Sequence, residues 1–105
     1  MTEIEFSNAA VADLDAIDDY SIMQFGEIAA ETYMRGFDEA FALLQHHPLA
    51  GPANAELGKS IRCLVHRKHR IFYIAEGDKV LVLRVIHQAM NAKRTLSGKA
   101  FGMGG

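Results

Sequence analysis

The chain has 105 residues, half of them hydrophobic, which predicts one domain with its own core and leaves too little sequence for a second. Its one cysteine, Cys63, excludes an internal disulfide, and neither a secretory signal nor the ~20 apolar residues of a membrane span is found, so we expect a cytoplasmic protein without membrane contact. The net charge of −2 hides an asymmetry, because residues 1–57 hold 11 acids and one base, whereas residues 58–105 hold ten bases and two acids.

The first predicted elements are a short strand and a helix. Residues 3–6 alternate polar and apolar side chains, which is typical of an edge strand. Ser7 or Asn8 can then cap a helix, because a short polar side chain can accept a hydrogen bond from a free N–H group of the first turn. Apolar residues at helical spacing predict that this helix runs from residue 9 to about residue 25, where Gly26 interrupts it.

A second apolar stripe predicts another helix. It runs from Ala30 to Leu44 with apolar residues three and four positions apart, and the helix should end at His46 or His47, before Pro48. The short connection at Gly26 makes the two helices an antiparallel hairpin. Residues 49–58 are rich in glycine, proline and asparagine, which indicates a loop.

After this loop the hydrophobic period changes from helical to strand-like. Three strands are expected, at residues 60–66, 70–75 and 79–87. Their short connections predict an antiparallel meander. The fold class is therefore α+β, with a short N-terminal strand and an antiparallel helix hairpin packed on the meander. Residues 1–97 form this one domain, and residues 98–105 form a flexible glycine-rich tail.

Two-residue turns would fix the register of the meander. Turns at Arg67-Lys68 and Gly77-Asp78 place Arg62 opposite Tyr73, Tyr73 opposite Val82, and Ile71 opposite Arg84. The face expected to pack on the helices then carries Ile61, Cys63, Val65, Phe72, Ile74, Leu81, Leu83 and Val85. The face expected to stay open carries Arg62, Leu64, His66, Ile71, Tyr73, Val80, Val82, Arg84 and Ile86. An apolar face that includes arginine and tyrosine suits a partner better than water.

Particular residues add a family pattern to this periodicity. Its sharpest part is the last strand, with Arg84-Val85-Ile86-His87 followed by Met90-Asn91. The other matching residues are Phe6, Ser7, Ala10, Asp13, Leu14, Ile17, Tyr20, Ala30, Tyr33, Phe41, Leu44, Pro48, Gly51, Arg62, the run from Arg70 to Tyr73, Val82, Leu83, Gln88 and Ala89. Over nearly its whole length the chain resembles the ParE toxins of the RelE/ParE superfamily.

The resemblance implies a toxin of a type II toxin-antitoxin, or plasmid stabilisation, system. Such a toxin inhibits DNA gyrase by protein–protein binding and is neutralised by a ParD-like antitoxin in a hetero-oligomer. The alternative is a ribosome-dependent mRNA endonuclease of the RelE type. This chain matches its basic cluster at Arg70, but it lacks the next expected arginine near Gln88-Ala89 and has no tyrosine in its tail. A third possibility is a degenerate toxin that only binds its antitoxin.

Seven residues are the candidates for partner binding: Arg62, Arg70, Tyr73, Arg84, His87, Lys93 and Arg94. RNA hydrolysis would need a base, an acid and a cation within hydrogen-bond reach, and the groups available on the open face are Arg62, Tyr73, Arg84 and His66. Interface cores often combine tyrosine with arginine, so we favour partner binding and expect no catalytic residue.

Other ligands are not expected. His66 and His69 lack a thiol or carboxylate at metal-ligand spacing, so no metal or other cofactor is predicted. The chain shows no recognition helix, which argues against sequence-specific binding of nucleic acid. Lys93, Arg94 and Lys99 form a basic end that is either a solvated tail or a contact with gyrase or with an acidic antitoxin segment.

Overall fold

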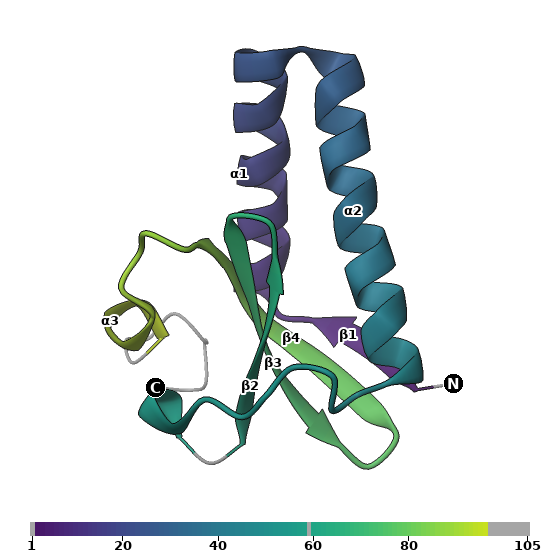
Figure 1. Cartoon of the computed structure of the whole chain (residues 1–105), viewed down its shortest axis with the longest axis vertical. Coiled ribbons are helices and arrows are strands. Elements are labelled where there is room, and N and C mark those ends of the chain that lie inside the picture. Colours follow the sequence, from purple (N-terminus) through teal and green to yellow (C-terminus); the bar gives the residue numbers. More distant parts are fainter. Residues whose placement is uncertain (1, 59, 97–105) are drawn as a thin grey trace.

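The chain folds as a four-stranded sheet with a long helix hairpin against it, as the computed structural model shows for residues 2–58 and 60–96 (Figure 1). In chain order the elements are β1 (Glu3–Phe6), α1 (Asn8–Phe25), α2 (Glu27–His46), the 3-10 turn η1 (Ala55–Leu57), β2 (Ile61–His66), β3 (His69–Glu76), β4 (Lys79–His87) and α3 (Ala92–Leu96). The predicted α+β class is confirmed. The tail expected at 98–105 lies outside the described residues. Within residues 2–58 and 60–96, no helix is both long and apolar enough to cross a membrane.

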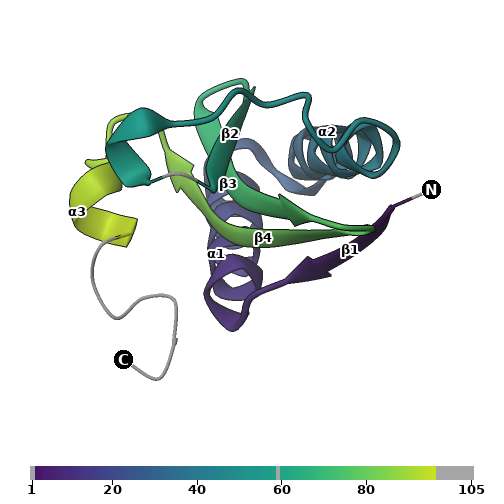
Figure 2. The same cartoon turned by 90° about the horizontal axis from the view of Figure 1, so that it is seen from below.

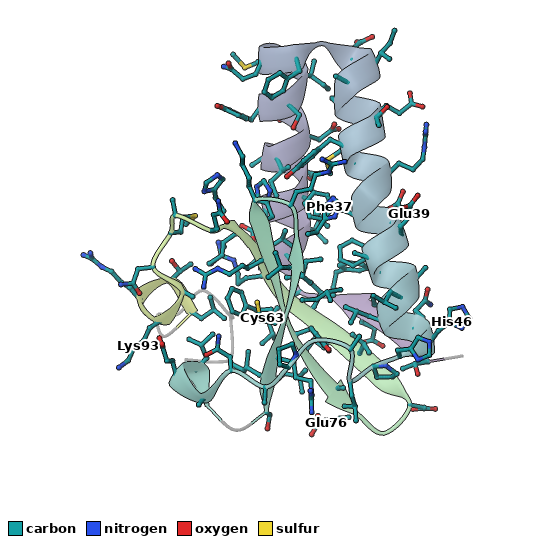
Figure 3. The ribbon with its side chains drawn as sticks, in the orientation of Figure 1. Phe37, Glu39, His46, Cys63, Glu76 and Lys93 are labelled. Atoms are coloured by element: carbon teal, nitrogen blue, oxygen red, sulfur yellow. The ribbon has the colours of Figure 1, made fainter. Side chains whose placement is uncertain are left out.

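The hairpin forms where the sequence predicts it. Ser7 caps α1, since its hydroxyl accepts a hydrogen bond from the backbone N–H of Ala10 at 3.0 Å. Gly26 joins the helices with a φ of 88°, a conformation that side-chain-bearing residues avoid. Most of the predicted stripe of α2 is buried, and Figure 3 shows its Phe37 pointing inward and Glu39 pointing outward. The end of the hairpin at Gly26 extends well beyond the sheet (Figure 1).

The sheet has the strand order β1-β4-β3-β2, with β1 parallel to β4 and the other pairs antiparallel. Both predicted two-residue turns are present, and the expected pairs Arg62 with Tyr73 and Tyr73 with Val82 are confirmed. The pair Ile71 with Arg84 is wrong. The register shifts between Phe72 and Tyr73, which leaves one extra residue, Leu83, as a bulge in β4. Ile71 therefore lies opposite Val85.

The predicted assignment of the two sheet faces is wrong for most of the sheet. The helices pack on the face that was expected to stay open, which carries Leu64, Ile71, Tyr73, Val80 and Val82. Val85 also packs there, as predicted, because the bulge in β4 reverses the alternation of side chains beyond it. The face proposed to bind a partner is thus largely sealed by the protein's own core.

The other face has its own small cover. Phe72 and Ile86 are buried there with Leu96 of α3, and Leu57, Ile61, Cys63 and Ala92 are half-buried beside them. The helix α3 lies at the opposite end of the sheet from the N-terminus (Figure 2). It was not predicted. Lys93 and Arg94 therefore belong to a folded helix and not to a disordered tail, although both side chains are exposed.

Candidate partner-binding groove

A groove of about 720 Å³ lies where the hairpin, the β2–β3 turn and the end of β4 meet. It is lined by Asp13, Ala16, Ile17, Tyr20, Ser21, Phe25, Ala29, Tyr33, Arg67, Lys68, His69, Val85, Ile86, His87 and Met90. Helices α1 and α2 form one side and the basic β2–β3 turn forms the opposite rim. We call this set of residues the groove.

Large apolar side chains line the groove on its α1 side and at its end. Tyr20 is 62% exposed, Phe25 is 70% exposed and Met90 is 44% exposed. These three side chains are off the stripe that packs against the sheet, so the fold does not bury them. Contiguous exposed apolar surface of this kind typically marks an interaction site.

The floor of the groove contains a tyrosine and two histidines. The Tyr33 hydroxyl and Nδ1 of His69 share a hydrogen bond of 2.6 Å, and the rings of His69 and His87 are 5.5 Å apart between centroids. Burial raises the pKa of Tyr33, so this phenol keeps its proton at neutral pH. Burial also lowers the pKa of His69, and the neighbouring His87 and His66 lower it further. The Tyr33 phenol and the His69 imidazole are therefore uncharged near pH 7.

His66 lies next to this floor, against the backbone of α2. The helix has a glycine at the contact, and a Cβ on Gly36 would lie 2.5 Å from Cε1 of the His66 ring. The ring also packs on Phe37, with 4.6 Å between centroids. Nε2 of His66 is buried without a hydrogen-bond partner in the described part of the chain. Burial lowers the pKa of His66 most, and the positive charge of Arg67 lowers it further.

These two histidines should make stability depend on pH. Because the folded state holds the pKa of His66 and His69 below the ordinary value of about 6.5, the unfolded chain binds more protons in mildly acidic solution. The free energy of unfolding should therefore fall as the pH drops below about 6.5 towards the folded-state pKa values. The measurement is the melting temperature by circular dichroism between pH 7.5 and pH 5.

The matched variants are His66→Gln with His69→Gln, and His46→Gln as the control. The double variant should show a smaller fall of the melting temperature with acidification than the wild type. The control should follow the wild type, since His46 is exposed at the end of α2 (Figure 3). Equal slopes in the wild type and the double variant would contradict the assignment.

Two of the predicted partner-binding residues instead hold the loop before β2. Tyr73 is fully buried, and its hydroxyl donates to the carbonyl of Pro48 at 2.8 Å and accepts from the N–H of Gly51 at 2.9 Å. Arg62 donates from Nη1 to the carbonyl of Gly51 at 2.7 Å. The expected exposure of Tyr73 is wrong, because the loop supplies the polar partners that let the phenol enter the core.

Arg70 and Arg84 also bind within the protein. Arg70 donates from Nη2 to the carbonyl of Met90 at 2.8 Å and so holds the segment that leads to α3. Arg84 makes a two-pronged pair with Asp13 of α1, from Nε to Oδ2 at 2.7 Å and from Nη2 to Oδ1 at 2.8 Å. The backbone N–H of Val85 donates to the same Oδ2 at 2.9 Å. This hydrogen bonding raises the pKa of Arg84.

The remaining three candidates are exposed but lie apart. His87 lines the groove, and its Nδ1 accepts from the N–H of Ala89 at 3.0 Å. Lys93 and Arg94 lie on α3, and Figure 3 shows Lys93 far from the hairpin. The sequence hypothesis missed Tyr20 and Phe25 as binding residues. The sequence pattern that could have identified them is the presence of large apolar residues close to Gly26 at positions outside the buried stripe of α1.

The four groups considered for RNA hydrolysis are not brought together. Arg62 and Tyr73 meet at the Pro48–Gly51 loop, His66 packs under α2, and Arg84 binds Asp13 of α1. Within residues 2–58 and 60–96 no three histidine, cysteine or acidic side chains are placed to hold a metal ion. What the groove offers chemically is apolar contact area with positive charge at one rim.

A family model and a curated relative point to the same family, and two solved structures share the fold. The family described as "ParE toxin of type II toxin-antitoxin system, parDE" matches residues 4–92. Toxin ParE1 of Caulobacter vibrioides is 33% identical over 96 residues, which cover 91% of this chain and 99% of that protein. A solved structure titled "Chromosomal ParDE TA system from P. aeruginosa" has a TM-score of 0.71 at 24% identity, covering 83% of this chain and 96% of that one. A copper-bound mutant toxin from Helicobacter pylori shares the fold with a TM-score of 0.54 at 14% identity, over 85% of this chain and 97% of that one.

Proposed function

The chain belongs to the family of ParE toxins of type II toxin-antitoxin systems, and we propose that it inhibits DNA gyrase by protein–protein binding and is neutralised by a ParD-like antitoxin. The family gives the toxin class. The finer proposal follows from the resemblance of the sequence, and the groove supports its antitoxin part. A related structure is itself titled as a ParDE system, in which such a toxin has an antitoxin partner.

The open apolar groove carries the antitoxin part of the proposal. An amphipathic helix can lay its apolar face against Tyr20, Phe25 and Met90, which is a common way for a groove to recognise a peptide segment. Arg67 and Lys68 at the rim favour an acidic segment over a basic one. An antitoxin with a flexible acidic segment fits both requirements.

The gyrase part of the proposal points to another surface. Lys93 and Arg94 are exposed on α3, at the far end of the sheet from β1. The hydrogen bond from Arg70 to the carbonyl of Met90 holds the segment that leads to this helix. Val85, Ile86 and His87 at the end of β4 also line the groove, so an antitoxin seated there would cover part of a target surface that includes this strand. We propose that α3 and the end of β4 contribute to the gyrase contact.

A supercoiling assay tests the gyrase proposal. Purified toxin added to gyrase and relaxed plasmid should reduce the supercoiled product, and toxin mixed beforehand with its antitoxin should not. The variant Lys93→Ala with Arg94→Ala should inhibit less, whereas Arg35→Ala on the outer side of α2 should inhibit like the wild type. Normal supercoiling at toxin concentrations well above those of gyrase would reject the proposal.

The ribonuclease alternative receives no support from the geometry. Its candidate groups are held apart by their own intramolecular partners, and Tyr73 is fully buried. A translation extract distinguishes the two functions. Toxin that acts on gyrase should leave messages intact, whereas cleavage at codon boundaries that depends on the ribosome would favour the RelE-type alternative.

A further inference from the structure

The β2–β3 turn combines an unfavourable backbone conformation with charges that the fold does not use. Its two residues are Arg67 and Lys68, and the strands close on them through the pair His66 with His69. Arg67 has a φ of 53°, the one positive value at a residue other than glycine in the described chain. Glycine, asparagine and aspartate adopt this conformation most readily, and a long side chain does so at a cost in stability.

No ion pair compensates that cost. Arg67 and Lys68 take part in no salt bridge within the described ranges, although the chain has 13 acidic residues. The one acid among the groove residues, Asp13, is already bound by Arg84 and by the N–H of Val85. The positive charge of Arg67 even lowers the pKa of its neighbour His66. The arginine at this position therefore does not serve the folded chain itself.

The position of the turn indicates what the charge serves. Both residues line the groove on the side opposite the apolar α1 wall, and the carbonyl of Lys68 accepts from the N–H of Gln88 at 2.7 Å, which fixes the turn at the rim. A helix seated in the groove would present its flank to the two cations. A guanidinium suits a carboxylate there, because it can bind both oxygens at once.

We propose that Arg67 is a specificity-determining residue that selects an acidic amphipathic helix in the groove by binding a carboxylate on the flank of that helix, with Lys68 as a second, weaker contact. The inference rests on the proposed antitoxin recognition. It adds that an arginine at this left-handed position makes the folded toxin less stable than a glycine would, in return for the contact with the antitoxin. Nucleic acid is a less suitable occupant, because the surface behind the cations is apolar and the outer surface of the hairpin carries Asp18, Glu27 and Asp38.

Three variants separate charge from backbone strain. Arg67→Gly removes both, Arg67→Lys keeps both, and Lys68→Ala removes a charge at a residue without positive φ. Each is titrated with the ParD-like antitoxin of the same operon by calorimetry at low and high salt, and each is melted by circular dichroism. Lys79→Gln, an exposed cation at the other turn of the meander, is the control.

The expected results differ in sign between the two measurements. Arg67→Gly should melt about 2–5 °C higher than the wild type, yet bind the antitoxin about 3- to 10-fold more weakly at low salt, with a smaller salt dependence. Lys68→Ala should bind more weakly without melting higher. Arg67→Lys should match the wild type in melting temperature and salt dependence. Lys79→Gln, whose exposed side chain pairs with Glu3 and Glu5, should match the wild type in antitoxin affinity and its salt dependence.

The contradicting outcomes are distinct. Wild-type toxin that does not bind the antitoxin would overturn the proposed function, and this inference with it. Binding that Arg67→Gly leaves unchanged would overturn the inference alone. A lower melting temperature for Arg67→Gly, checked with Arg67→Asn, would overturn the strain argument. Tighter binding of a single-stranded RNA than of the antitoxin, lost in Arg67→Gly, would assign the rim to nucleic acid and reject the acidic helix.

Discussion

Replacing Asp13 with alanine should lower the free energy of unfolding by about 2–4 kcal/mol, because it leaves a half-buried guanidinium without its partner. Both side chains of the pair with Arg84 are only 15% exposed. The same substitution removes the acceptor of the Val85 N–H, so a backbone donor also loses its hydrogen bond. The measurement is urea unfolding followed by circular dichroism at neutral pH.

Neighbouring variants show whether the pair is responsible for the loss. Asp19→Ala, at an exposed site on the same helix, should leave stability almost unchanged. The stability of Asp13→Asn should fall between those of Asp13→Ala and Asp19→Ala, since the amide oxygen can still accept a hydrogen bond from the N–H of Val85. The double change of Asp13 and Arg84 to leucine should recover much of the loss, because no unpaired charge remains. An Asp13→Ala variant as stable as the wild type would show that water satisfies Arg84.

Removing the two aromatic side chains at the α1 side of the groove should weaken antitoxin binding about 10- to 100-fold while leaving the fold intact. Tyr20 and Phe25 are largely exposed in the free toxin, so Tyr20→Ala with Phe25→Ala removes little that the core uses. In a complex they would be the large anchors that typically dominate binding energy. Calorimetric titration with the antitoxin measures the loss.

The hairpin itself provides the matched control. Met23 and Ile28 are 82% and 86% exposed near the same helix turn but do not line the groove. Met23→Ala with Ile28→Ala should therefore bind the antitoxin as the wild type does. In cells, antitoxin should rescue growth from the control variant and fail to rescue it fully from the groove variant. Equal losses in both variants would point to the hairpin tip as the binding surface.

The helical half of the fold follows from local signals in the sequence. Ser7 and Gly26 mark the ends of α1 through capping and backbone chemistry that depend on nearby residues alone. The buried stripe of α2 follows in the same way from its spacing. Such signals need no knowledge of the rest of the chain, so the two ends of α1 and the end of α2 were predicted to within about one residue, whereas the start of α2 at Glu27 precedes the predicted stripe.

The sheet faces could not be predicted because two long-range features decide them. The bulge at Leu83 changes the register within one strand, and no glycine or proline marks it. Tyr73 enters the core because Pro48 and Gly51 satisfy its hydroxyl from a loop more than 20 residues earlier in the chain. Both faces are rich in apolar side chains, so alternation alone could not choose between them.

The candidate site was predicted only in part for the same reason. Arginine and tyrosine were expected to be free for partners, but Arg62, Arg70 and Arg84 bind carbonyl or carboxylate oxygens of their own chain. Of the seven predicted residues, His87 alone lines the groove. The groove depends on how the hairpin lies over the β2–β3 turn, and this packing is not encoded in the pattern of any one element.

The last strand holds the beginning of the chain. β1 pairs with β4, and the Ser7 hydroxyl donates to the carbonyl of Leu83, 76 residues further along. Contacts between such distant residues carry a larger loop-closure cost than local contacts, so we expect this pairing to form after the helix hairpin. A chain still being synthesised on the ribosome has no β4 to pair with until residue 87 has been made, so we expect the toxin to reach its folded shape only after that point. An antitoxin made at the same time can then meet each toxin as it folds.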